Sequence, residues 1–474
     1  MRSRKILLLL PALIIILTVS VMVALPSNIF AQVVVRHDTT VVTTTTVDTV
    51  RQGDTIWPGQ IINKSNYPAV QPYLSPGNYE LVRQGMPLRV VPSTRLDWPP
   101  PYLAATEKYS PQCSLGSDGS LNGYVAGLPF PLMDPNDPSI ATKIIWNYTY
   151  RPMHSDDADI RYPEIATYSP YGDEPVNYVS MGHMAFYNNV GRVEVPPIPT
   201  DPDARASGIR SKFAMFPFIE PSAMHGYGLL RFRYLDTHKA DDIWMYNRES
   251  RRLRRETESS QSDVISATPA FSGNPGSPMG GVVMAPTAAF ANNLDSDSIF
   301  GFSANPANYS YRFLGERRML APVHTLRVSE AACSSDNHLR CMENWEIRRL
   351  YVIEAHARPN TNMTIPTRIL YVDSEGWFIP ASDQYDRDDR LWKTLVNFIT
   401  YDDRAAPGAR IAVYPYKRFF QVGMIDADLE SGYTSVASMP GPHAPGPDSW
   451  YVNMGAVDNS FFTTGNLEVA SNRP

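Results

Sequence analysis

Between residues 228 and 398 the sequence repeatedly places short runs of branched and aromatic residues between polar turns. Runs with this pattern occupy 228–234, 242–246, 251–255, 345–355, 367–373, 377–380 and 391–398. Branched and aromatic side chains favour a pleated surface, and the Gly, Asn, Asp and Ser residues between the runs favour turns. Because the connections are short and no helix separates the strands, the segment predicts an antiparallel meander.

Within this meander, residues 242–255 predict a hairpin with a strongly cationic strand. The first strand reads Ile-Trp-Met-Tyr, the turn Asn-Arg-Glu-Ser, and the second strand Arg-Arg-Leu-Arg-Arg. Successive side chains of a strand point to opposite faces, so Leu253 can lie on an apolar face and Arg252 and Arg254 on the other. We therefore expect Arg252 and Arg254 to face water or a partner protein.

Residues 1–31 have the organisation of a secretory signal peptide. A basic start, Met-Arg-Ser-Arg-Lys, precedes an apolar run over residues 6–25, and the small residue Ala31 offers a cleavage position. The run is long for a signal peptide, so an uncleaved inner-membrane anchor is the alternative. In both cases we expect the rest of the chain to be exported, as a periplasmic protein.

Beyond the leader, the chain is expected to contain one β domain with irregular flanks. Residues 32–101 hold a Thr/Val tract at 39–50 and then repeated prolines, which indicate an extension or linker. Residues 102–430 form the predicted domain, and the proline-containing residues 431–474 are expected to form an irregular tail. One helix is expected at 138–148, with Asp137 as its cap and Pro138 in its first turn.

Charge and cysteine content restrict the class of protein further. The net charge of −6 gives no indication of nucleic-acid binding. Cys333 and Cys341 flank a short polar loop, and in an exported protein they are predicted to form a disulfide. A Cys–His metal site is the alternative, but His338 is the single histidine nearby. Cys113 is then expected to be a free thiol.

Several segments, in a fixed order, carry a resemblance to a known family. They are 124–131, 134–138, 144–147, 244–246 with 251–255, 314–319, and the block 345–377 that continues through 382–386 to Leu391-Trp392. Together they resemble the bacterial exported family called domain of unknown function thirteen-twenty-nine, which is grouped with the outer-membrane lipoprotein-sorting proteins LolA and LolB. Residues 357–368 depart from the family's pattern.

The resemblance implies a mainly β (α+β) fold, in which a curved antiparallel sheet forms a half-open barrel and helices cover its apolar side. It implies a space between sheet and helices that receives acyl chains or other lipophilic groups. It further implies partners in envelope transport, such as resistance-nodulation-division exporters and outer-membrane proteins. It implies neither a cofactor nor catalysis.

Aromatic residues of the predicted helix and strands are the candidates for lining a ligand cavity. They are Trp146, Trp244, Tyr246, Trp345, Trp377 and Trp392. Aromatic side chains also fill protein cores, and a cavity differs from a core only in whether side chains occupy its volume. Both interpretations remain open from the sequence.

Patterns for catalysis and metal binding find no support in the sequence. No two histidines have the helical spacing of a zinc site. The acidic stretches 154–159 and 383–389 could hold a hard cation, but both are better interpreted as polar turns. Glu346 and Glu354 would lie about 26 Å apart along one strand, too far for an acid–base pair.

The sequence therefore predicts a non-catalytic periplasmic binding or carrier protein for a lipophilic ligand such as an acyl chain, lipid or lipoprotein. The alternative is a structural module that docks onto an envelope exporter or an outer-membrane protein.

Overall fold

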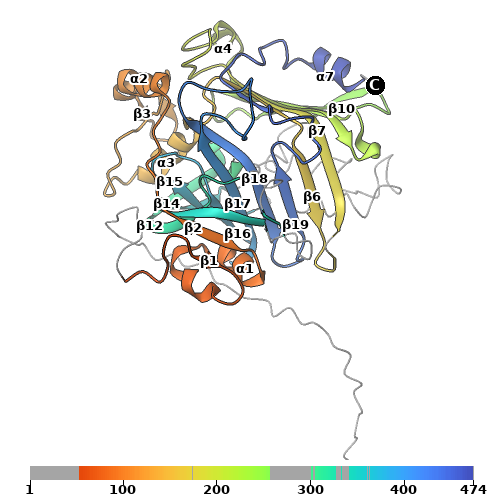
Figure 1. Cartoon of the computed structure of the whole chain (residues 1–474). Coiled ribbons are helices and arrows are strands. Elements are labelled where there is room, and N and C mark those ends of the chain that lie inside the picture. Colours follow the sequence, from red (N-terminus) through yellow and green to blue (C-terminus); the bar gives the residue numbers. More distant parts are fainter. Residues whose placement is uncertain are drawn as a thin grey trace, which may run out of the picture. The chain divides into compact units, whose positions relative to one another are not determined.

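A large antiparallel β-sheet dominates the fold, as seen in a computed structural model of the chain (Figure 1). The structure describes residues 53–172, 174–256, 300–302, 305–326, 332–333, 341–359, 361, 363 and 365–472. The predicted leader at 1–31 and the Thr/Val tract at 39–50 lie outside these residues. Among the helices described, none has the length and apolar character needed to cross a membrane.

Strands follow one another along most of the chain. Their bounds are β1 Ile61–Ile62, β2 Leu88–Val91, β3 Ser114–Leu115, β4 Leu121–Asn122, β5 Asp157–Arg161, β6 Glu164–Tyr168, β7 Pro175–Asn188, β8 Ile209–Glu220, β9 Gly228–Tyr234, β10 Asp242–Asn247, β11 Arg252–Glu256, β12 Tyr309–Ala321, β13 Ala332–Cys333, β14 Cys341–Ala357, β15 Thr367–Asp373, β16 Ala381–Tyr385, β17 Leu391–Asp402, β18 Arg418–Asp428, β19 Thr434–Ser438 and β20 Trp450–Val452. The α-helices are α1 Pro76–Gln84, α2 Pro100–Tyr109, α3 Ile140–Thr149, α4 Pro202–Ser207 and α7 Thr464–Ser471, and the short 3-10 helices are η1 Tyr67–Tyr73, η2 Ser110–Gln112, η3 Ser222–Met224 and η6 Pro306–Asn308.

Strand pairing gives the sheet two ends. From one end the order is β11, β10, β9, β8, β7, β6, β19, β18, β17, β16, β15, β14 and β12. These neighbours are all antiparallel, whereas β2 pairs with β14 in parallel. Within the described part of the chain β11 and β12 do not pair, so the sheet does not close into a barrel.

One core cluster collects side chains from both halves of the sheet. Ile165 of β6 and Val179 of β7 belong to it, as do Phe398 of β17 and Phe419 of β18. Strands so far apart in the pairing order can share a core only if the sheet curves around it. Helix α3 packs against β12, and α7 packs against β8 and β9. The predicted fold class, a mainly β chain with a curved, open antiparallel sheet and covering helices, is confirmed.

The predicted hairpin at 242–255 is confirmed. Asn247 pairs with Arg252 and Tyr246 with Leu253, which leaves residues 248–251 as the turn. Tyr246 is buried, and Leu253 packs partly buried against the same cluster. The apolar face of the hairpin therefore lies under α7.

The hairpin that follows β15 forms, but its second strand begins later than expected. The sequence predicted a strand over 377–380, whereas β16 starts at Ala381. Residues 374–380 form a loop, because Asp373 Oδ1 accepts hydrogen bonds from the amides of Glu375 and Gly376. Trp377 adopts a φ of 58°, which is incompatible with an extended strand.

Residues 53–101, expected to be an extension or linker, instead contribute elements to the same core. Leu81 and Val82 of α1 and Leu88 of β2 are fully buried in it. Helix α1 packs against β16 and β17, and Figure 1 shows it beside β1 and β2. The prolines here mark helix starts as well as extended chain: Pro76 occupies the first turn of α1 after the capping residue Ser75.

The C-terminal residues also differ from the irregular tail that was expected. β19 connects β18 to β6, and β20 pairs with β5. Trp450 is 1% exposed and belongs to the main core. The segment is therefore part of the sheet, although its loops remain rich in proline.

The predicted helix at 138–148 is present as α3, with a different start. It begins at Ile140 rather than at Pro138, and Ser139 occupies the cap position. Asp137 accepts a hydrogen bond from the Ser139 amide and pairs with Lys143 at 2.5 Å. It therefore stabilises the turn before the helix instead of capping the helix itself.

Candidate functional site

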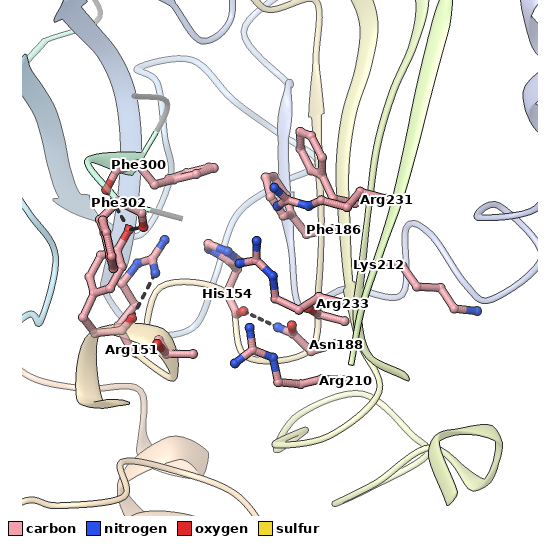
Figure 2. Close-up of a pocket in the computed structure, with 14 residues that line it drawn as sticks. Arg151, His154, Phe186, Asn188, Arg210, Lys212, Arg231, Arg233, Phe300 and Phe302 are labelled. Atoms are coloured by element: carbon pink, nitrogen blue, oxygen red, sulfur yellow. Dashed lines mark hydrogen bonds between the residues drawn. The ribbon is translucent and has the colours of Figure 1, made fainter. Parts of the chain in front are cut away.

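A pocket opens between the sheet and two loops that face it (Figure 2). One wall is a face of β7, β8 and β9, and the other is formed by the end of α3, the residues that follow it and residues 300–302. Its cavity volume is about 100 Å³, within a wider hollow of about 800 Å³ that includes open solvent. Phe186 pairs with Phe213, and Phe213 pairs with Arg231. Since cross-strand partners share a face, all three point toward the pocket.

Aromatic rings form the apolar part of this pocket. The Phe186 ring centroid lies 4.8 Å from that of Phe213 and 5.2 Å from that of Phe300. Tyr148 holds the 300–302 segment in place, because its one hydroxyl hydrogen is shared between the carbonyls of Phe300 and Phe302. Rings from the sheet, from α3 and from a separate segment thus meet in one place.

Two arginines of β9 extend into the same space. Arg231 and Arg233 alternate with Phe232 and therefore share one face of the strand. Arg233 Nη2 lies 2.8 Å from Asp241 Oδ2, and Arg231 Nε lies 4.0 Å from the same oxygen. Asp241 is 3% exposed. One buried carboxylate therefore orients both guanidinium groups.

Arg210 reaches the pocket through a β-bulge. In β8, Ile209 pairs with Tyr234 and Ser211 with Arg233, so Arg210 has no opposite residue in β9. A bulge redirects side chains locally, and the adjacent residues Arg210 and Ser211 both line the pocket.

The Arg210 side chain is buried with part of its hydrogen-bonding capacity unused. The residue is 7% exposed, and its Nη1 atom has no hydrogen-bond partner in the described structure. Its guanidinium lies 5.8 Å from the ring centroid of Tyr150. Burial lowers the pKa of Arg210, and the Coulombic effects of Arg233 and Asp241 oppose each other.

Arg151 supplies a further guanidinium from the opposite wall. It lies 4.5 Å from the Tyr148 ring centroid and 5.4 Å from that of Phe300, and its Nη1 donates to the Tyr148 carbonyl at 3.0 Å. Burial lowers its pKa. No carboxylate of the described residues forms an ion pair with it. Arg151 is thus a cation held against aromatic rings.

His154 lies in the middle of the pocket. Burial, together with the charge of Arg151, holds the pKa of His154 well below its usual value, so the imidazole is neutral at neutral pH. Its Nδ1 atom has no hydrogen-bond partner among the described residues. Asn188 of β7 donates to the His154 carbonyl at 2.9 Å and fixes this loop to the sheet.

The pocket has an excess of positive charge. Among the described residues, the guanidinium groups of Arg151, Arg210, Arg231 and Arg233 face one carboxylate, that of Asp241, so these five side chains carry a formal charge of +3. Lys212 also contacts the pocket, but its ammonium group points away and donates to Asn459 Oδ1 at 2.6 Å (Figure 2).

The six aromatic residues predicted to line a cavity do not line this pocket, and the structure distributes them over separate places. Trp345 belongs to the main core, and Trp377 belongs to the cluster beneath α3. Trp244 and Tyr246 belong to the cluster beneath α7. Trp146 and Trp392 lie outside these clusters. Trp146 Nε1 donates to the Gly119 carbonyl at 2.9 Å, and Trp392 Nε1 donates to Asp428 at 3.1 Å.

The arginines predicted to face a partner lie on the surface. Arg252 and Arg254 are both exposed and pair through the backbone with Asn247 and Met245. Arg255, in contrast, pairs with Asp242 and lies over the Trp244 ring.

The cysteine prediction divides into two parts. Backbone pairing places Cys333 of β13 directly opposite Cys341 of β14, and residues 334–340 between them lie outside the described part. The disulfide stays a prediction. Cys113 is a free thiol, as expected, and burial raises its pKa to about 11.

The acidic segments 154–159 and 383–389 are only partly turns, because residues 157–159 belong to β5 and residues 383–385 belong to β16. Asp156 accepts hydrogen bonds from the amides of Val193, Glu194 and Val195. At the other segment, Asp386 Oδ1 accepts from the amide of Arg390 at 2.9 Å. Across the described ranges, no group of three or more His, Cys, Asp or Glu side chains could hold a metal ion.

The glutamates once considered as a catalytic pair have arginine partners of their own. Glu346 lies 3.3 Å from Arg348, and Glu354 lies 2.5 Å from Arg312. The negative charge of each carboxylate is therefore balanced by its own arginine.

Sequence reasoning missed the arginines of the pocket. The alternation of Arg231 and Arg233 around Phe232 was visible, and two inward-facing arginines on a buried strand would have been the signal. Arg210 and Arg151 had no comparable signal, because a bulge and a long-range contact bring them to the site.

Several solved structures are similar to this chain at low sequence identity. One is a domain described as an outer membrane lipoprotein-sorting protein domain from Vibrio parahaemolyticus, with 15% identity and a TM-score of 0.40 over 70% of this chain and 100% of that chain. Another is a DUF1329 family protein from Desulfovibrio piger, with 13% identity and a TM-score of 0.38 over 66% of this chain and 92% of that one. A LolA superfamily protein from Nitrosomonas europaea aligns with 13% identity and a TM-score of 0.29 over the same shares.

No curated protein matches the sequence significantly. A family model does: the one described as "Protein of unknown function (DUF1329)" matches residues 61–271 and 280–468. These ranges include the strands, α3 and the pocket residues of β7, β8 and β9. The chain therefore belongs to the DUF1329 family, and the resemblance drawn from its sequence is confirmed.

Proposed function

We propose that this protein is a non-catalytic binding or carrier protein for a lipophilic ligand, such as an acyl chain or a lipid. The observation that carries the proposal is the pocket of β7, β8 and β9, where the rings of Phe186, Phe213 and Phe300 meet. Aromatic-lined concave sites with a few convergent polar groups are typical of small-molecule binding. The family resemblance implies the same kind of ligand.

The chemistry of the lining residues supports binding without catalysis. Arginine stays protonated in proteins and cannot serve as a general base. His154 is the titratable group best placed for proton transfer, but its depressed pKa makes it a weak base. Among the described residues that line the pocket there is no carboxylate and no thiol.

The proposal includes a location and a role. The predicted leader indicates export, so the protein would bind its ligand in the periplasm. By carrying the ligand between membranes it would contribute to envelope lipid transport. An exporter or an outer-membrane protein would then deliver or receive the ligand.

Two measurements test the binding function. Protein purified from its native compartment should release a lipid on organic extraction, identified by mass spectrometry. The purified protein should also enhance the fluorescence of a polarity-sensitive acyl probe, and Phe186→Ala should weaken that binding because it opens the ring wall.

Phe461→Ala is the matched control. Phe461 is also partly buried, but it packs against Phe216 and His183 on the opposite side of the same strands. Its replacement should leave probe affinity unchanged, with folding of both variants checked by circular dichroism. Absence of extracted lipid together with absence of probe binding would refute the carrier function.

A second candidate is a docking module, favoured by the exposure of Arg252 and Arg254 at one end of the sheet. If this surface binds an envelope exporter or outer-membrane protein, the double charge reversal Arg252→Glu with Arg254→Glu should abolish co-purification and leave acyl-probe binding intact. Retention of the same partner by the charge-reversed protein would exclude this surface.

A further inference from the structure

We propose that the basic side of the pocket binds an oxyanion, a carboxylate or a phosphate, carried at the end of an apolar chain. The inference rests on the proposed binding function and specifies the class of ligand. The anion would lie among Arg210, Arg233 and Arg151, and the chain would follow the phenylalanine wall.

Arg210 is buried with a hydrogen-bond donor that has no acceptor among the described residues. A buried donor without an acceptor costs free energy, and the cost is larger for a charged group. Arg210 is 7% exposed, its Nη1 lacks a partner, and it lines the pocket. Carboxylates and phosphates match the planar donor fork of a guanidinium, with two parallel hydrogen bonds. An oxyanion would supply the acceptor that Arg210 Nη1 lacks among the described residues.

Arg233, a second cation of the pocket, is held in a fixed position near Arg210. Arg233 Nε donates to both carboxylate oxygens of Asp241, at 3.0 and 3.2 Å, and Arg233 Nη2 donates to Asp241 Oδ2 at 2.8 Å. The Arg233 side chain is thereby fixed on the same side of β9 as the pocket, and its charge repels that of Arg210. A bound anion between Arg210 and Arg233 would attract both guanidinium groups and so offset their mutual repulsion.

The cations of the pocket lie next to its aromatic rings. Arg231 lies 5.1 Å from the Phe213 ring centroid, and Arg151 lies 5.4 Å from that of Phe300. Figure 2 shows Arg210, Arg231 and Arg233 reaching from the strands toward His154, while Phe300 and Phe302 approach from the other wall. A ligand with a charged end and an apolar body fits both features. A purely apolar ligand would leave Arg210 Nη1 without an acceptor among the described residues.

The test is a set of ligands that share a chain and differ in their end group. Dodecanoate, dodecyl phosphate, dodecanol and dodecyltrimethylammonium are titrated into the full-length purified protein by displacement of the acyl probe, with acetate and inorganic phosphate as chainless anions. Dodecanoate or dodecyl phosphate should bind at least about tenfold more tightly than dodecanol, the effect of one charge-assisted hydrogen bond. The carboxylate and phosphate arms identify which head group is preferred.

Variants connect the preference to the named residues. Arg210→Gln should remove most of the difference in affinity between dodecanoate and dodecanol, chiefly by weakening dodecanoate binding. Arg210→Lys, which keeps the charge without the planar fork, should restore part of it. Arg387→Gln removes an equal charge at an exposed turn between β16 and β17 and should change nothing.

The outcomes distinguish a failure of the oxyanion assignment from a failure of the lipophilic-binding function. Equal affinity for dodecanoate and dodecanol overturns the oxyanion assignment and leaves lipophilic binding standing. No binding of any dodecyl ligand overturns both. Inorganic phosphate that binds as tightly as dodecyl phosphate overturns the assignment of an amphiphile. A persisting anion preference in well-folded Arg210→Gln overturns the role of Arg210.

Discussion

Arg348 and Asp373 form a two-pronged ion pair inside the sheet, with Nε 2.8 Å from Oδ2 and Nη2 3.2 Å from Oδ1. The same guanidinium donates to Glu375 and, at 2.6 Å, to the carbonyl of Thr94. One buried side chain of β14 thus connects β15 with the N-terminal segment that precedes α2. The Coulombic effects of its three acidic neighbours outweigh burial and raise its pKa.

Replacing Arg348 with Met should destabilise the fold strongly. The carboxylates of Glu346 and Asp373 are fully buried and would lose their counter-charge. Breaking a buried ion pair by removing one partner costs about 3–5 kcal/mol, and chemical denaturation should show a loss of this size. Arg387→Met, at an exposed turn, is the control and should change the free energy of unfolding little. A loss below about 1 kcal/mol at Arg348, typical of surface pairs, would contradict the structural role.

Asp383 of β16 predicts an unusual dependence of stability on pH. Its carboxylate is fully buried and accepts hydrogen bonds from Ser75, the Gly77 amide and Thr394, and burial raises its pKa to about 6. The unfolded carboxyl titrates near about 3.9, so between these values the folded state binds more protons than the unfolded state. The contribution of Asp383 to stability must therefore fall as pH rises from about 4 to about 6 and stay constant above.

Denaturation of the wild type and of Asp383→Asn at several pH values isolates this group. Asn does not titrate, so the wild type should lose stability relative to the variant across that pH interval, by up to about 3 kcal/mol. A difference between the two proteins that does not vary with pH would show that the carboxyl has an ordinary pKa.

The backbone register of Cys333 and Cys341 predicts a cross-strand disulfide. Directly opposed residues of antiparallel strands have Cα atoms about 4.5–5.5 Å apart, within the range that a disulfide spans. Peptide mapping under non-reducing conditions should recover the two cysteines in one linked fragment and Cys113 as a free thiol. Cys333→Ser with Cys341→Ser should lower the free energy of unfolding by about 2–3 kcal/mol. Recovery of both residues as free thiols from the exported protein would rule the bond out.

Arg210→Met should make the ligand-free protein more stable while weakening anion binding. Methionine has a similar length, and it removes a charge that is buried without an ion-paired carboxylate among the described residues. Replacing buried ionic groups by apolar ones is often stabilising by about 1–4 kcal/mol, and residues kept for function commonly carry such a cost. Thermal unfolding without ligand measures this gain. A variant less stable than the wild type would show that Arg210 serves the fold itself.

The elements that the sequence predicted well are those whose signal is local. The hairpin of β10 and β11 combines alternating apolar residues with a polar turn, and both features lie within a few residues of each other. The turn before β17 is similar, because Asp386 bonds to the amides of Asp388 and Arg390 beside it.

The errors arose where distant parts of the chain decide the structure. Prolines between residues 58 and 101 indicated a linker, yet Ser75 and Pro76 are also a helix start, and α1 is retained because Asp383 and Thr394 of the sheet hold its first turn. The pocket is the extreme case. Its cations come from β8, β9 and the loop after α3, and no local pattern relates Arg151 to Arg210.

The bulge in β8 has a consequence for comparing members of this family. Because Arg210 enters the pocket only as the extra residue between Ile209 and Ser211, a chain one residue shorter here would restore regular pairing and carry the guanidinium out of the site. The length of the segment between Gly208 and Phe213, more than the identity of any single side chain, should then mark which homologues share a head-group preference. Two proteins that align well elsewhere could differ in ligand by one deletion.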